Sequence, residues 1–226
     1  MSQTITEFVC FRVKSSVRPE DADNDEGQAL LNLFRSTKQQ SGHQSSAWGR
    51  VVEDEQILVW VLEWSDARGS IAVGHLHPFL ADAPQHPTAI YATLNPPLSA
   101  TSTLTSNPTT EICALPFPST MSVPETKQLN ADLINFRTAV VEQLPPESGP
   151  RSWAMGHIDR PSLLPHAKSP SGEAFVHLLV VGWDSVEAHK KAKESAQFVS
   201  GIAPIREKML PPVPGLEMKH VSFQAI

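Results

Sequence analysis

Several features that usually reveal a function are missing from this sequence of 226 residues. Its two cysteines, Cys10 and Cys113, form neither a disulfide framework nor the paired spacing of a metal site. No apolar run is as long as a membrane span, and the N-terminal residues MSQTITEF lack the basic and then apolar order of a secretory signal. We therefore expect a reduced, cytoplasmic protein with no membrane partner.

The common cofactor and nucleophile motifs are missing as well. There is no GxGxxG before a helix, no Walker loop, and no GxSxG, HExxH or CxxC motif. The net charge of −6 and the pI near 5.8 argue against nucleic acid as a partner. We therefore expect neither a metal nor a cofactor. Any chemistry would rest on histidine, tyrosine, acidic side chains and the shape of a pocket.

The sequence does contain an internal repeat. Residues 63–79, EWSDARGSIAVGHLHPF, resemble residues 182–198, GWDSVEAHKKAKESAQF, and both copies continue an apolar run. In each copy a phenylalanine stands 15 positions after the tryptophan. The likeness extends to TEFVCFRV at residues 6–13 and TEICALPF at residues 110–117. One structural unit is therefore predicted twice.

The periodicity of each half predicts the order β-α-β-β-α-β, which is the ferredoxin-like arrangement. The expected strands are residues 6–13, 45–52, a run ending at 64 and 88–94 in the first half, and residues 110–117, 151–158, a run ending at 183 and 217–223 in the second. We place the first repeat at residues 1–98 and the second at residues 110–226. Residues 99–109 are rich in proline, serine and threonine, as expected of a linker.

The third strand of each half is almost wholly apolar, as ILVWVL and FVHLLVV illustrate. A four-stranded antiparallel sheet with two helices on one face leaves its other face uncovered, and so apolar a face is not stable in water. The economical cover is the other half of the same chain. We therefore expect an α+β fold in which the two antiparallel sheets pack into one barrel within a single chain, with an apolar small-molecule pocket inside it.

At this point the sequence resembles the dimeric α+β barrel superfamily, which includes the antibiotic-biosynthesis monooxygenases, the stress-responsive A/B barrel proteins and olivetolic acid cyclase. The residues that carry the resemblance are Trp48-Gly49, EWSD and GWDS at the strand ends, the helix SVEAHKKAKESAQF, and His77-Pro78-Phe79. They span nearly the whole chain and are specific for the fold rather than for a reaction. In most of the family two chains make the barrel. Here one chain would do so, and pairing of such barrels into a homodimer stays open.

Histidine and tyrosine are the candidate catalytic residues. The resemblance implies that a histidine of the HP stretch acts with a tyrosine as general base and acid, which points to His77, to its neighbour His75 and to Tyr91. His177 lies within an apolar strand, where an unpaired imidazole is costly. The alternatives are surface positions for the first two histidines, a core position for His177 and an ordinary strand position for Tyr91. Because the second half has Ala196-Gln197 in place of His77-Pro78, we expect one working pocket rather than two.

Five more residues are candidates for substrate binding. Large aromatic side chains usually belong to the core, but one or two can stack on a flat ligand. An acid that ends an apolar strand either lines the pocket or caps the next helix, and a histidine in a loop at a barrel mouth often contacts a ligand. The candidates are Trp60, Trp64, Glu63, His220 and His43.

Three functions are compatible with these residues. The first is a cofactor-independent cyclase, isomerase or lyase of secondary metabolism that acts on a hydrophobic, polyketide-like intermediate. The second is a cofactor-free monooxygenase of the same fold, and the third is a non-catalytic, stress-associated protein that binds a small molecule. We favour the enzyme. The sequence leaves its substrate open, because this fold hosts many unrelated functions.

Overall fold

The computed structural model describes residues 4–66, 69–71, 73–82 and 86–226. The strands are β1 (Ile5–Arg12), β2 (His43–Val51), β3 (Asp54–Trp64), β4 (Thr88–Asn95), β5 (Thr109–Pro118), β6 (Ser152–Arg160), β7 (Leu164–Pro165), β8 (Glu173–Trp183) and β9 (Lys219–Ala225). The helices are α1 (Asp25–Ser36), α2 (Leu98–Thr101), α3 (Val123–Glu142), α4 (Val186–Lys193) and α5 (Ala196–Arg206), with the 3-10 segments η1 (Thr37–Gln39) and η2 (Val73–Phe79).

Eight of these strands form a closed antiparallel barrel. Their order is β5-β9-β2-β3-β1-β4-β6-β8, and β8 pairs with β5 to complete the ring. The short strand β7 pairs with the beginning of β8 and lies outside the ring. The prediction of an α+β fold built around one barrel is therefore confirmed.

Within each half the strands follow the same spatial order, β4-β1-β3-β2 in the first and β9-β5-β8-β6 in the second. Two seams join the halves, one between β2 and β9 and one between β4 and β6. The backbones approach closely at both seams. A Cβ atom on Gly49 would lie 2.3 Å from the carbonyl oxygen of Ser222, and one on Gly156 would lie 1.7 Å from that of Thr93. Each seam therefore needs a glycine.

The inside of the barrel is filled by side chains. Alternate residues of the barrel strands point inward and form one apolar core, which includes Phe8, Val61, Leu178 and Phe223. An eight-stranded barrel has an interior just wide enough for its side chains. A hollow of about 30 Å³ remains inside, and a larger pocket of about 390 Å³ adjoins it at the barrel end, where Cys10, Thr88 and Lys219 line both. The ligand pocket that we expected inside the barrel is thus replaced by a packed core.

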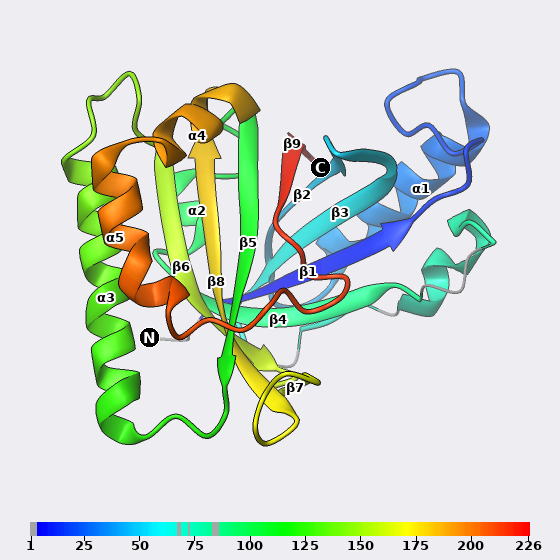
Figure 1. Ribbon diagram of the computed structural model, residues 1–226. Coiled ribbons are helices and arrows are strands. Elements are labelled where there is room, and N and C mark those ends of the chain that lie inside the picture. Colours follow the sequence, from blue (N-terminus) through cyan, green and yellow to red (C-terminus); the bar gives the residue numbers. More distant parts are fainter. Residues whose placement is uncertain (1–3, 67–68, 72, 83–85) are drawn as a thin grey trace.

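Helices cover the outside of the barrel on two sides, as Figure 1 shows. α1 and η2 pack on the first-half sheet, whereas α3, α4 and α5 pack on the second-half sheet. α3 begins with the predicted capping box between Ser122 and Glu125. The second helix expected in the first half is the shorter 3-10 segment η2, which contains Pro78. Among the described residues, no helix combines the length and the apolar character that crossing a membrane requires.

Residues 99–109, expected as a linker, pack against one end of the barrel. Leu98 and Leu104 belong to the barrel core, and Thr103 is fully buried. The carboxylate of Glu63 accepts hydrogen bonds from the backbone N–H groups of Leu98 at 2.7 Å and Ser99 at 2.8 Å, at the start of α2. This segment therefore closes one end of the barrel in addition to connecting the halves.

Candidate functional site

A cavity of about 140 Å³ lies between the outer face of the second-half sheet and the helices that cover it. β5, β6 and β8 form its floor, and α3, α4 and α5 form its walls. Its lining is largely apolar and includes four aromatic residues, Phe136, Trp153, Trp183 and Phe198. An engineered apolar cavity of about 150 Å³ holds a benzene ring. The cavity therefore has room for about one ring, with the rest of a ligand extending through the mouth.

The cavity exists in the second half because two side chains of its floor are smaller than their counterparts in the first half. The strand register places Leu179 where the first half has Trp60, and Leu115 where it has Phe11. Both leucines line the cavity. In the first half the ring of Trp60 packs on that of Phe34, with 4.3 Å between the ring centroids. In the first half, large aromatic side chains thus fill the space that forms the cavity in the second half.

Glu111 is the acidic group of this cavity. It lies on β5 with 7% of its surface exposed, and its Oε2 accepts a hydrogen bond from the indole N–H of Trp183 at 3.0 Å. Burial raises the pKa of Glu111 to about 7, although the hydrogen bond from Trp183 and the charge of Lys193 act to lower it. Near neutral pH the carboxyl group is therefore divided between its acid and base forms, which suits general acid–base catalysis.

Two buried histidines connect Glu111 to the protein surface. Nε2 of His189, on α4, lies 3.4 Å from Oε2 of Glu111, and Nδ1 of His189 lies 2.8 Å from Nε2 of His220, on β9. Nδ1 of His220 is in turn 2.5 Å from Oε1 of Glu53, which follows β2. The histidine side chains are 3% exposed and that of Glu53 is 46% exposed. We call these four residues the histidine row.

The surroundings of the histidine row keep His189 neutral. Burial, the largest cause, lowers the pKa of His189 to about 3, and the charge of Lys193 acts in the same direction. Its ring stacks on that of Trp183, with 4.8 Å between the ring centroids. At the outer end partial burial acts to raise the pKa of Glu53, but the hydrogen bonds from His220 bring it below its ordinary value. The row therefore begins at a partly protonated carboxyl group and ends at a carboxylate.

Two cationic side chains stand at the mouth of the cavity. Lys193 of α4 is half-buried and Arg206 of α5 is exposed, and neither has a hydrogen-bond or ion-pair partner in the described part of the chain. The indole N–H of Trp153, which lines the cavity, is buried and also lacks a partner there. Buried donors are normally satisfied. These groups favour a ligand that brings a hydrogen-bond acceptor and an anionic group.

The thiol of Cys113 also faces the cavity. Burial raises its pKa to about 12, and the neighbouring Glu111 acts in the same direction. The neutral thiol is a poor nucleophile and a poor metal ligand. Within the ranges that the structure describes, no group of three or more histidine, cysteine, aspartate or glutamate side chains is placed to hold a metal ion.

The first half contains a matching carboxyl group with more hydrogen-bond partners. Glu7, fully buried on β1, accepts hydrogen bonds from the indole N–H of Trp64 at 2.8 Å, the hydroxyl of Tyr91 at 2.9 Å and the backbone N–H of Ile71 at 3.3 Å. Burial raises the pKa of Glu7, and the three hydrogen bonds oppose that effect. A glutamate–tryptophan pair therefore occurs in both halves, and that of the second half borders the cavity of ring size.

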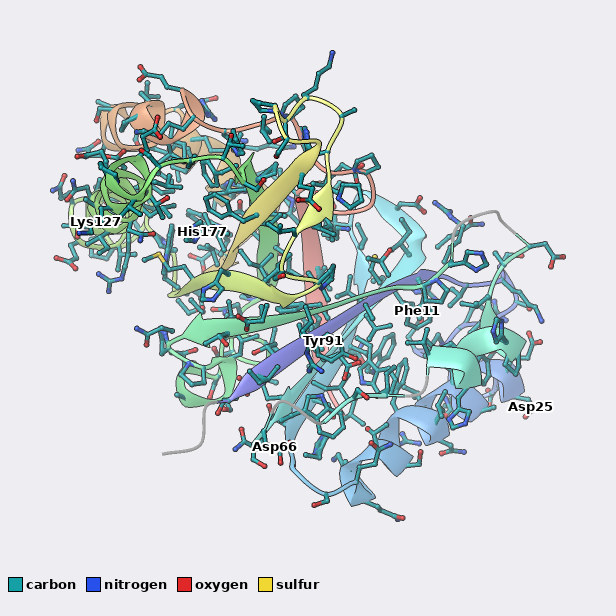
Figure 2. All side chains as sticks on the ribbon, turned by 90° about the horizontal axis from the view of Figure 1, so that it is seen from below. Phe11, Asp25, Asp66, Tyr91, Lys127 and His177 are labelled. Carbon is teal, nitrogen blue, oxygen red and sulfur yellow. The ribbon has the colours of Figure 1, made fainter. Side chains whose placement is uncertain are left out.

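The predicted catalytic residues do not come together. His75 and His77 are exposed on η2 and do not line the cavity. Tyr91 is bound to Glu7, and burial raises its pKa to about 12. His177 is half-buried on β8, where burial lowers its pKa to about 4. Figure 2 shows Tyr91 and His177 well apart on the barrel. The two halves do differ, but the ring-sized cavity lies in the half without the HP stretch.

Of the predicted substrate-binding residues, His220 belongs to the histidine row. Trp60 lies in the core beneath α1, and Trp64 is a buried hydrogen-bond donor. Glu63 accepts hydrogen bonds at the start of α2, which agrees with its alternative reading as a helix cap. His43 meets Trp64 edge-on, with 5.8 Å between the ring centroids, and burial lowers its pKa. These four residues do not line the ring-sized cavity.

The most important residues of the site were not singled out from the sequence, although a signal was present for some of them. Thr6-Glu7 and Thr110-Glu111 place a glutamate at the same point of two apolar strands, and an acid repeated there indicates a buried, hydrogen-bonded carboxyl group. His189 and Lys193 stand four residues apart and therefore on one face of α4. No pattern marks Glu53, which reaches His220 only through the β2–β9 seam.

No family model matches this chain, and no curated protein matches it in sequence. Solved structures do resemble it. A protein provisionally named a monooxygenase, from Fusobacterium nucleatum, matches with a TM-score of 0.54 and 10% identity, over 99% of this chain and 93% of its own. An anthrone oxidase-like protein matches with a TM-score of 0.57 and 12% identity, over 99% and 92%. A protein provisionally named a chlorite dismutase matches with a TM-score of 0.58 and 10% identity, over 99% and 96%. At these identities the likeness shows a shared α+β barrel fold.

Proposed function

We propose that the protein is a cofactor-independent enzyme that moves a proton on a small ring compound held in the second-half cavity, with Glu111 as the acid–base group. The observation that carries this proposal is a carboxyl group with a pKa of about 7 inside an apolar cavity of ring size. Such a base removes a proton beside a carbonyl group. The proton then returns elsewhere, which isomerises the compound, or the resulting enolate closes a ring. Cyclase or isomerase chemistry on a polyketide-like compound fits this site.

The chemistry of the lining also suggests a substrate class. The aromatic side chains favour a flat apolar body, and the unpartnered indole N–H of Trp153 favours a carbonyl or phenol oxygen on it. Lys193 and Arg206 at the mouth favour an anionic group at the outer end of the molecule. We therefore propose an aromatic or polyketide-like compound that carries a carboxylate.

A second candidate is oxygenation without a cofactor. Two of the proteins with similar structures are named as a monooxygenase and as an anthrone oxidase-like protein. Removal of a phenol or enol proton by Glu111 would give an electron-rich anion, which dioxygen then oxidises. Both candidates begin with the same proton transfer, and consumption of dioxygen distinguishes them.

The arrangement of the halves supports a duplicated origin, with repeats at residues 1–98 and 110–226. Both halves have the same strand order, and both carry the glutamate–tryptophan pair. We propose that the first copy kept this pair for structure, while the second retained room for a ligand.

Ligand binding can be tested with 1-naphthoate and its uncharged counterpart 1-naphthalenemethanol, followed by tryptophan fluorescence. We expect the carboxylate to bind more tightly than the alcohol, because Lys193 and Arg206 pair with it. Leu179→Trp should fill the cavity and abolish binding, whereas Val199→Trp, which adds the same indole at an exposed position of α5, should not. Equal binding by both tryptophan variants would contradict the assignment of the cavity.

Proton transfer can be tested with 5-nitrobenzisoxazole, whose ring opens with a colour change when a base removes its acidic C–H proton. We expect the rate to rise with pH around an apparent pKa of about 7, as for Glu111. Glu111→Gln should lower the rate by about 100-fold or more, and Glu147→Gln, at an exposed position, should leave it unchanged. Naphthoate binding with no difference in rate between wild type and Glu111→Gln would instead support a non-catalytic binding protein.

A further inference from the structure

When both of its rings are neutral, the histidine row has one consistent pattern of hydrogen bonds. Glu53 is a carboxylate and accepts from Nδ1–H of His220, so Nε2 of a neutral His220 carries a lone pair. That lone pair must accept from Nδ1–H of His189 at 2.8 Å. Nε2 of the neutral His189 then carries a lone pair as well, and it faces Oε2 of Glu111 at 3.4 Å. Each donor in the row therefore points toward the surface.

The front of the cavity cannot serve for proton exchange once a ligand is bound. A ring that fills about 140 Å³ excludes water from Glu111, and its anionic end would lie between Lys193 and Arg206 at the mouth. The indole of Trp183, stacked on His189, shields the row on one side. A base that is sealed in this way needs another route by which to lose or regain its proton.

We propose that Glu53, His220 and His189 form a proton relay that connects Glu111 with the solvent behind the bound substrate. This inference rests on the proposed function of Glu111. The O–H bond of Glu111 breaks as Nε2 of His189 takes the proton, the Nδ1 proton of His189 passes to Nε2 of His220, and the Nδ1 proton of His220 passes to Glu53, which releases it to water. One proton leaves Glu111 and one reaches the solvent, and no electrons are exchanged.

The distances along the relay set its order of events. The two outer contacts, at 2.5 and 2.8 Å, are already short hydrogen bonds, whereas the 3.4 Å contact between Glu111 and His189 must shorten by a few tenths of an ångström. Contacts of catalytic groups often tighten in this way only when a substrate is bound. Return of a proton along the same path restores the starting forms of both rings.

Other charged groups near Glu111 do not offer an alternative path. Lys193 on α4 and Arg206 on α5 are cations without a lone pair, and the thiol of Cys113 on β5 is neutral. The matching glutamate of the first half has different partners, which supports the inference. There the matching Glu7 meets the hydroxyl of Tyr91, and no histidine is among its hydrogen-bond partners in the described residues.

The first test is the protonation pattern of the rings, read from the nitrogen chemical shifts of ¹⁵N-labelled histidine side chains in the whole protein. Well below pH 7, where Glu111 keeps its proton, we expect both His189 and His220 to carry theirs on Nδ1, with the signals assigned by His189→Phe and His220→Phe. His166 provides a reference of the opposite kind, because its Nε2 donates to the carbonyl of Pro211 while its Nδ1 accepts from a backbone N–H. A proton on Nε2 of either relay histidine under these conditions, with Glu111 protonated, would overturn the proposal, whatever the activity of Glu111.

The second test measures transfer itself in the Leu179→Trp variant, where the added indole fills the cavity and so takes the place of a bound ligand. After a rapid pH jump, the infrared band of protonated Glu111, identified by its loss in Glu111→Gln, reports the rate of deprotonation. Glu53→Gln keeps a hydrogen-bond acceptor for His220 but cannot take up the proton, so we expect deprotonation to slow by about tenfold or more. Glu55→Gln, an exposed change nearby on β3, should have no effect. Equal deprotonation rates in Leu179→Trp alone, with Glu53→Gln added and with Glu55→Gln added would overturn the relay.

Discussion

Replacing Glu111 with glutamine should stabilise the protein at neutral and alkaline pH. The glutamine oxygen can still accept from Trp183, and its amide group can donate to Nε2 of His189, so the variant resembles the protonated form of Glu111. Burial holds the pKa of Glu111 at about 7 in the folded protein, compared with an ordinary value of 4.5. The unfolded chain therefore ionises at a lower pH than the folded one, and wild type loses stability as the pH rises through this range.

The size of this loss follows from the two pKa values. A pKa raised from 4.5 to about 7 corresponds to about 3 kcal/mol of unfolding free energy. This stabilising contribution of Glu111 to the free energy of unfolding is fully present below about pH 4.5 and is lost as the pH rises through about 7. His189 affects stability with the opposite pH dependence. Its pKa is lowered to about 3, so its stabilising contribution is present above about pH 6.5 and is lost as the pH falls. Because both proteins contain His189, its effect largely cancels in their difference.

Urea unfolding of wild type and Glu111→Gln between about pH 4 and pH 8 measures this difference. We expect the advantage of the variant to grow by about 3 kcal/mol across the range, which shifts the urea midpoint on the order of 1 M. Glu147→Gln provides a flat reference, because its side chain is exposed. A difference that is independent of pH, or a variant that becomes weaker toward pH 8, would show that Glu111 is ionised and paired with His189, and would refute our view of the site.

Three further predictions concern stability, each measured by urea unfolding. At neutral pH Glu7→Gln should be less favourable than Glu111→Gln by about 1–3 kcal/mol, because an amide cannot accept all three hydrogen bonds of Glu7. An equal effect of the two substitutions would contradict this. Gly156→Ala should cost about 3 kcal/mol, since the new methyl group meets a backbone carbonyl at the β4–β6 seam, whereas Gly74→Ala, with its nearest neighbour at 3.9 Å, should cost far less. Ser122→Ala should cost about 1 kcal/mol by removing the capping box of α3, and no loss would mean that the cap is not formed in solution.

The fold was largely predictable because its signals are periodic and strong. The apolar strands ending at Trp64 and Trp183 leave a sheet face that water does not tolerate, and mutual cover by the two halves is the simple solution. The capping box of Ser122 was visible because it is a local pattern. The sequence pattern did not predict that the barrel interior is packed. The alternation of apolar and polar residues along a strand shows which side chains face inward, but it does not show whether their volumes leave room for a ligand.

The site was much less predictable, for two physical reasons. The cavity depends on a difference in side-chain volume, Leu179 against Trp60, at positions whose equivalence rests on the strand register. The histidine row brings together Glu53 and His220, which are far apart in the sequence and meet across a seam. Short histidine motifs drew attention to His77, whose position on η2 is exposed. Burial and charge pairing, which shift a pKa, are tertiary properties.

The β2–β9 seam determines which activity of the protein is lost first when the barrel opens. Glu53 precedes β3 in the first half, and His220 lies on the last barrel strand in chain order, so they meet only when the ring of strands is shut. Any opening of this seam separates the solvent end of the histidine row from Glu111 while the cavity walls, all from the second half, remain together. Proton exchange at Glu111 would then fail before ligand binding does. On heating, proton exchange at Glu111 would therefore be lost at a lower temperature than ligand binding, and its loss would report the opening of the barrel.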